Sequence, residues 1–142
     1  MHEVVVEIDG IVPETVRCAL KHDLTIGADL AREAERAASM YGYYAVLSEK
    51  ALARLRRTEL SFKMWRVHEE DAIEEELKSL GKKLTIKNID RWLMKREKYR
   101  GYELLIIRLK SESGILNAIA RAFEHKKDLI QTLNANRRRE IS

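Results

Sequence analysis

The chain has 142 residues, of which 35% are charged and only 6% aromatic, with one proline and one cysteine. No long uncharged apolar run occurs and Cys18 has no partner for an internal disulfide, which excludes a membrane-spanning or a disulfide-stabilised protein. The formal net charge of +4 favours an anionic partner only weakly. A lone cysteine, and an N-terminus that is acidic where a signal peptide is basic, predict a cytoplasmic protein.

Residues 1–27 are predicted to form a β-strand followed by a short helix. Apolar and acidic side chains alternate over 3–9, which is typical of a strand. Pro13 is well placed to begin a helix that continues to about Lys21. Since an isolated strand leaves its backbone groups unpaired, we expect a partner strand either at 82–88 or in a second copy of the chain.

A long helix is predicted over residues 28–80, because this stretch has no proline and only Gly42 would kink or weaken it. At ~1.5 Å per residue, such a helix is ~80 Å long. Its apolar residues recur at helical spacing, although irregularly. This stripe consists of Leu30, Ala34, Ala37, Tyr41, Tyr44, Ala51, Leu55, Phe62 and Trp65.

Two further helices complete the chain. Thr85 suits the N-cap of a short helix over 86–97, with Ile89 and Leu93 on one face. A second long helix is predicted over 99–138, where apolar residues alternate at steps of three and four in a heptad pattern. This seam consists of Tyr102, Leu105, Leu109, Leu116, Ile119, Phe123, Ile130 and Leu133, with Glu112 and Lys126 at two further seam positions.

These elements predict a mainly α fold, in which residues 28–142 form one helical domain built as a long antiparallel hairpin with coiled-coil-like packing. The stripe of the first long helix is too irregular to cover the whole seam of the last one. We therefore expect an oligomer, in which copies of the chain associate through these helices. The expected oligomer seam is Leu105, Leu109, Leu116, Ile119, Phe123, Ile130 and Leu133.

Charged residues gather in three successive blocks. Residues 50–66 carry a net charge of +5, residues 69–76 a charge of −6 and residues 82–100 a charge of +6. Aromatic residues accompany both basic blocks. Because the six acidic residues cannot neutralise all fourteen basic ones, the excess cations need another partner.

Basic side chains beside exposed aromatic rings are typical of single-stranded nucleic acid sites, because cations neutralise phosphates while rings stack on bases. The alternative is that Phe62, Trp65 and Trp92 belong to the core and that the arginines pair with the acidic block across the hairpin. Three more arginines lie at the end of the last helix. The helix dipole stabilises cations there, but its effect fades within the last turn, so it does not account for all three. The candidate DNA-binding residues are Lys50, Arg54, Arg56, Arg57, Lys63, Trp65, Arg66, Lys87, Arg91, Trp92, Lys95, Arg96, Arg137, Arg138 and Arg139.

The sequence gives no sign of catalysis, of a metal centre or of a cofactor. The histidines are scattered, with no pair four residues apart and no cysteine cluster. No glycine-rich phosphate loop or nucleophilic serine motif occurs. The run HEED at 68–71 lacks the second histidine of metalloprotease helices, and an acidic helix face explains it. We expect a binding protein and not an enzyme.

Three stretches resemble the phage recombination mediator proteins of the UvsY type. The first, at 28–57, is ADLAREAERAASMYGYYAVLSEKALARLRR, where tyrosines precede a basic helix. The second, at 84–99, is LTIKNIDRWLMKREKY, where a threonine introduces Ile-Asp and then a basic and aromatic end. The third, at 118–141, is AIARAFEHKKDLIQTLNANRRREI. The resemblance covers residues 28–141 and leaves the N-terminal strand outside it.

The resemblance implies an accessory protein that binds single-stranded DNA and helps load a strand-exchange recombinase onto DNA covered by single-strand binding protein. It also implies a homo-oligomeric ring of helical subunits, in the host cytoplasm if a phage encodes the chain. Carried over by residue, it assigns phosphate contacts to Lys50, Arg54, Arg56 and Arg57. The N-terminal strand and the uninterrupted first long helix depart from the pattern of the type member.

A protein of a different class fits the same features. In this alternative the chain is a coiled-coil adaptor, or a phage structural or inhibitor protein, whose basic patches bind an acidic protein. Salt-sensitive binding to labelled oligonucleotides separates the two hypotheses, because a phosphate-driven site loses affinity steeply as salt rises.

Overall fold

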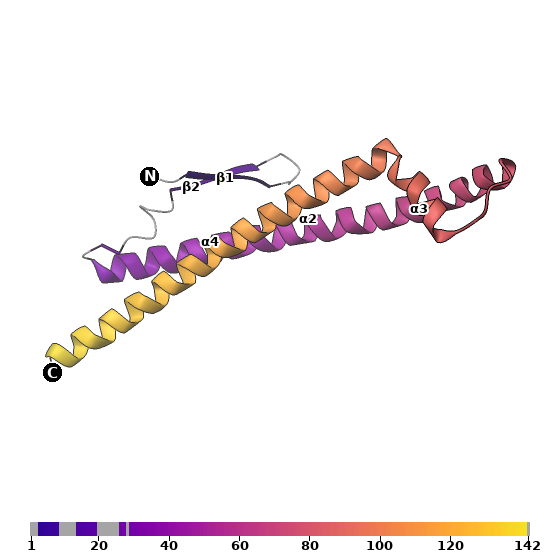
Figure 1. Cartoon of the computed structure of the whole chain (residues 1–142). Helices are drawn as coiled ribbons and strands as arrows, with labels where there is room; N and C mark the ends of the chain where they lie inside the picture. Colours follow the sequence, from indigo (N-terminus) through magenta and orange to yellow (C-terminus); the bar gives the residue numbers. More distant parts are fainter. Residues whose placement is uncertain (1–2, 9–13, 20–25, 28, 142) are drawn as a thin grey trace. The chain divides into compact units, whose positions relative to one another are not determined.

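The computed structural model describes residues 3–8, 14–19, 26–27 and 29–141, and over these residues the protein is mainly helical (Figure 1). α2 and α4 pack as an antiparallel helical hairpin, and α3 lies in the connection between them. The chain divides into two units, which we call the first unit, Met1–Leu52 with Ser111–Ser142, and the second unit, Ala53–Lys110. The bounds of the helices are Leu30–Ser79 for α2, Ile86–Met94 for α3 and Glu97–Ile141 for α4.

Two short strands pair near the N-terminus. β1, Glu3–Ile8, and β2, Glu14–Ala19, are antiparallel, in a register that places Val6 opposite Val16. The partner of β1 is therefore β2 of the same chain. Residues 82–88, one of the two partners that the sequence suggests, instead form the connection after α2 and the first turn of α3.

Residues 14–19 form a strand where the sequence predicts a short helix. The β-branched residues Thr15 and Val16 favour extended backbone, and a neighbouring strand is present to pair with them. A hairpin satisfies the backbone groups of both segments, and this pairing outweighs a helix signal that rests on one proline. Pro13 and Lys21, the ends of the predicted helix, lie outside the described residues.

The first long helix is continuous and matches the prediction over 28–80 to within two residues at its start and one at its end. It remains helical at Gly42. Gly81 follows its last turn with a φ of 66°, and the N–H of Lys82 donates a hydrogen bond to the carbonyl of Leu77 at 3.0 Å. Glycine adopts this left-handed conformation without steric cost, so the chain leaves α2 by a sharp turn.

The short helix is set by its cap and by its buried face. Thr85 is the N-cap, as predicted, and its Oγ1 accepts a hydrogen bond from the N–H of Asn88 at 3.2 Å. α3 ends at Met94, three residues before the predicted end at 97. The next helix, α4, begins at Glu97. Its apolar face completes the core of the second unit, which consists of Ile73, Leu77 and Leu93, with Trp65, Ile89, Trp92 and Tyr99 packed against it.

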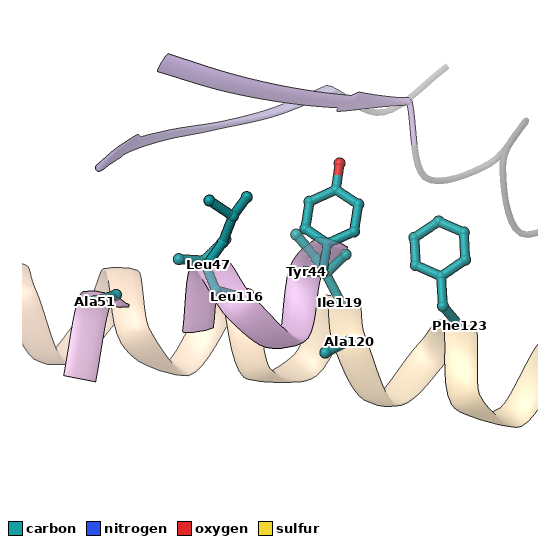
Figure 2. Close-up of a cluster of buried hydrophobic side chains, with 7 residues drawn as sticks. All are labelled: Tyr44, Leu47, Ala51, Leu116, Ile119, Ala120 and Phe123. Atoms are coloured by element: carbon teal, nitrogen blue, oxygen red, sulfur yellow. The ribbon is translucent and has the colours of Figure 1, made fainter. Parts of the chain in front are cut away.

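In the first unit the two long helices meet through small and aromatic side chains. The rings of Tyr44 and Phe123 stack, with centroids 5.5 Å apart and planes within 4° of parallel. A second cluster joins Leu30 and Ala37 to Ile130. Figure 2 shows the main cluster along the contact, with Tyr44, Leu47 and Ala51 from α2 and Leu116, Ile119, Ala120 and Phe123 from α4.

The heptad pattern predicts correctly which face α4 buries. Tyr102 and Leu105 are half-buried, and Leu133 is the exception at 41% exposure. This burial takes place within one chain, so these side chains do not form the exposed oligomer seam that the sequence predicts. Two buried residues of α2 lie outside the stripe that the sequence predicts: Leu47 packs in the contact with α4, and Leu77 packs against Leu93 of α3. The fully buried seam residues are Leu109, Leu116, Ile119, Phe123 and Ile130.

A charged residue occupies one position of the buried seam. Lys126 is 4% exposed, and its Nζ lies 2.8 Å from Oε2 of Glu33 on α2. The hydrogen bond from Lys126 holds the pKa of Glu33 below its ordinary value of 4.5, against the opposing effect of burial. A buried lysine is tolerated here because a carboxylate neutralises it.

We expect Phe123→Ala to lower the free energy of unfolding by about 3–5 kcal/mol, because it removes a buried ring and leaves a cavity beside Tyr44. Leu133→Ala, on the same helix but largely exposed, should cost roughly 1 kcal/mol or less. Urea denaturation followed by circular dichroism measures both values. Equal losses in the two variants would show that the stacked cluster does not hold the first unit together.

The pair of Glu33 and Lys126 should make stability depend on pH. Because the folded-state pKa of Glu33 lies below its ordinary value, its stabilisation is present above pH 4.5 and is lost as the pH falls through the folded-state pKa. The advantage of the wild-type chain over Glu33→Gln should therefore shrink in acid. Melting temperatures of both chains across this range measure it, with Glu35→Gln as the control for an exposed carboxylate of the same helix. An advantage that stays constant into acid would contradict the pairing.

Candidate nucleic-acid interface

Exposed cations surround α3 in the second unit. The buried face of α3 is formed by Leu93 with the half-buried Ile89, so residues spaced by four on the other face point outward. Lys87 and Arg91 lie on this outer face and Lys95 follows at the C-cap. We call the group the α3 surface, and it consists of Lys82, Lys83, Lys87, Arg91, Lys95 and Lys98, all of which are exposed.

The α3 surface contains an open hollow of ≈ 690 Å³. Its lining combines the cations Lys87 and Arg91 with Asp90 and with two apolar side chains. Ile86 is 81% exposed and Met94 62% exposed, so both side chains are accessible to a ligand. The hollow therefore offers positive charge beside apolar contact area.

The two tryptophans are less available than the sequence alone suggests. Trp65 and Trp92 are half-buried and pack against the core of the second unit. Trp65 also lies 5.8 Å from the ring of Tyr102, and the ammonium of Lys82 lies 5.3 Å from the ring centroid of Trp92. These contacts support the alternative in which the aromatic residues belong to the core.

Arg96 is held by acidic residues of its own chain. Its guanidinium Nη2 donates to both carboxylate oxygens of Glu76, at 3.0 and 3.2 Å, and its Nε lies 3.4 Å from Glu69. This is the pairing across the hairpin that the alternative interpretation expects. Since Arg96 precedes α4 and both carboxylates lie on α2, the contact fixes the start of α4 within the second unit.

Arg66 is engaged as well. Its guanidinium lies 3.8 Å from Glu70, one turn away on α2, and about 6 Å from the ring centroids of Phe62 and Tyr99. Burial, and then the negative charge of Glu103, raise the pKa of Tyr99. Arg66 is therefore part of a cluster of aromatic and charged side chains between α2 and α4.

The remaining candidate cations lie on the long helices. In the second unit, Arg56, Arg57 and Lys63 are exposed on α2, whereas Arg54 is half-buried. In the first unit, Lys50 is exposed on α2. The arginines Arg137, Arg138 and Arg139 are also exposed and lie in the last turns of α4, and Arg137 borders a small hollow with Leu30, Leu133 and Glu140.

The structure brings only part of the predicted site together. Lys87, Arg91 and Lys95 share the α3 surface, while the other candidates are spread along α2 and α4. Lys82 and Lys83 follow the turn at Gly81 and precede α3, and Lys98 lies in the first turn of α4. The charge balance of residues 82–100 includes all three, although none of them is among the candidate residues that the sequence suggests.

Neither a metal-binding cluster nor a membrane-spanning helix is present among the described residues. In the parts of the chain that the structure describes, no group of three or more His, Cys, Asp or Glu side chains lies close enough to hold a metal ion. No helix among them has the length and apolar content needed to cross a membrane.

Comparisons with protein families, with curated proteins and with solved structures find no match for this chain. The resemblance to the recombination mediator proteins thus depends on the three sequence stretches quoted above.

Proposed function

We propose that the protein is a non-enzymatic, single-stranded DNA-binding accessory protein, and that the α3 surface is its main DNA contact. The observation that carries the proposal is the set of exposed cations on this surface. Lys83, Lys87, Arg91 and Lys95 make no ion pair with a carboxylate of any described residue, whereas Arg66 and Arg96 do. Cations on and beside one short helix that have no ion-pair partner among the described residues suit a polyanion, because each phosphate contact releases a bound counterion.

A single strand suits this surface better than a duplex. α3 is about 13 Å long, at 1.5 Å per residue, and a flexible strand can bend to follow so short a helix. Ile86 and Met94 are exposed between the cations, and unpaired bases present the flat apolar faces that such side chains can contact. Trp92 packs against the core of the second unit, so its ring is not an exposed surface on which a base could stack.

The narrower role follows from the resemblance. We propose that the protein acts as a recombination mediator, which helps a strand-exchange recombinase replace single-strand binding protein on DNA. Arg56 and Arg57, exposed on α2, are then secondary phosphate contacts. The arginines at the end of α4 serve to attract the polyanion, since a cluster of three exposed cations raises the local concentration of an anionic ligand.

The test replaces Lys87, Arg91 and Lys95 together with alanine and measures binding to a labelled thymidine oligonucleotide by fluorescence anisotropy at several salt concentrations. We expect affinity to fall at least about tenfold, and the slope of log affinity against log salt to decrease by about 2, since each lost phosphate contact contributes roughly 0.7. These side chains are exposed, so melting should change little.

The matched control replaces Arg137, Arg138 and Arg139 with alanine, which removes the same charge from the other end of α4. This variant should bind DNA more slowly and lose less affinity. Equal losses in both variants would show that net charge alone drives binding, and that α3 is no site.

Competition distinguishes DNA from an acidic protein partner. Unlabelled single-stranded oligonucleotide should displace the probe at lower concentration than duplex of the same length or polyglutamate, because only the single strand offers both phosphates and unpaired bases. Polyglutamate competing equally well would favour the adaptor hypothesis instead.

A further inference from the structure

A carboxylate lies among the cations of the α3 hollow, where the attraction of phosphates does not explain it. Asp90 is half-buried and lines the hollow together with Lys87 and Arg91. Among the residues that the structure describes, none forms an ion pair with its carboxylate. A negative charge beside phosphate contacts opposes the binding of a polyanion by Coulomb repulsion. If DNA binds here, Asp90 therefore needs a role that offsets this repulsion.

The stability of α3 does not account for Asp90 either. An acidic side chain interacts favourably with the helix dipole only near the first turn, where the free N–H groups lie. Asp90 is the fifth residue of α3, beyond its first turn, and Thr85 already caps the start of the helix. Both carboxylate oxygens are therefore available to accept hydrogen bonds from a ligand.

The outer part of α3 carries two rows of side chains, because residues spaced by four lie above one another on a helix, ~6 Å apart along its axis. One row holds the carboxylate between two exposed apolar side chains, and the neighbouring row holds cations alone. We call the first the mixed row, which consists of Ile86, Asp90 and Met94, and the second the cation row, which consists of Lys87, Arg91 and Lys95. A strand whose phosphates follow the cation row brings its bases to the mixed row.

The chemistry of the mixed row favours one base. A carboxylate has two acceptor oxygens and no donor. Guanine presents two adjacent donors on its Watson–Crick edge, the N1–H and the 2-amino group, so it can donate to both oxygens at once. Adenine, cytosine and thymine each present one donor group on this edge, beside acceptor atoms that repel a carboxylate. Asp90 therefore matches guanine better than any other base.

We infer, as an extension of the proposed DNA contact, that Asp90 gives the α3 surface a preference for unpaired guanine. The carboxylate accepts hydrogen bonds from the N1–H and the 2-amino group, Ile86 and Met94 contact the base on either side, and Lys87 and Arg91 bind the flanking phosphates. In a duplex both donors are already bonded to cytosine, so only a single strand offers them. Strands without guanine still bind, because the cation row attracts phosphates of any sequence.

The test compares labelled thymidine oligonucleotides that differ at one central position, by fluorescence anisotropy with the full chain. The central base is guanine, thymine, or hypoxanthine, which keeps the N1–H of guanine but lacks its 2-amino group. We expect the guanine probe to bind about fivefold more tightly than the thymine probe, at the lower end for a bidentate contact because Asp90 is only half-buried. The hypoxanthine probe should lose most of this advantage.

Two variants assign the preference to Asp90. Asp90→Asn keeps the size of the side chain but replaces one acceptor with a donor, so the guanine and thymine probes should bind equally well. Its affinity for the thymine probe should be unchanged or higher, because a negative charge is removed beside the phosphates. Glu97→Gln is the matched control, since it removes an exposed carboxylate at the start of α4 and outside the hollow. This control should keep the fivefold preference.

The thymine probe separates this inference from the proposed function. A wild-type chain that binds both probes equally, in a salt-sensitive manner, would overturn the guanine preference and leave the DNA contact standing. A preference that survives in Asp90→Asn, or a hypoxanthine probe that binds as tightly as guanine, would also overturn the role of Asp90. A wild-type chain that binds no probe would overturn the proposed function, and the guanine preference with it.

Discussion

The burial of one apolar stripe of α4 against α2 is the constraint on which the other features depend. Both helices are rich in charged residues, and most of the stability of long helices in water comes from packing and not from intrinsic propensity. In the first unit the stripe packs around the stacked rings of Tyr44 and Phe123. In the second unit Ile73 and Leu77 of α2 pack against Leu93 of α3, and Tyr99 of α4 packs against this cluster. A lysine within the stripe is paired with Glu33, whose carboxylate lies 2.8 Å from its ammonium.

One face of each long helix is buried in this contact, so only the side chains on its other faces are available to bind a ligand. The acidic block of α2 is partly used within the chain, since Glu69 and Glu76 hold Arg96 and Glu70 holds Arg66. The cations of α3 have no such partners among the described residues, and they remain on the surface. Internal pairing therefore separates the basic residues into those that stabilise the hairpin and those that are available to a ligand, a division that a count of charges does not reveal.

Features that depend on local periodicity and local hydrogen bonding could be predicted from the order of the amino acids. The heptad steps identified Leu109, Leu116, Phe123 and Ile130 as buried, and the position of Thr85 identified the start of α3. Contacts between distant parts of the chain account for the strand at residues 14–19, for the burial of the seam within one chain, and for the packing of Trp65 and Trp92 against a core. The same kind of contact pairs Arg96 with Glu76 and places Val67 and Ile107 along one groove. Periodicity states which face of a helix is apolar, but which surface covers that face depends on contacts between residues far apart in the chain, and these have no signature in local spacing.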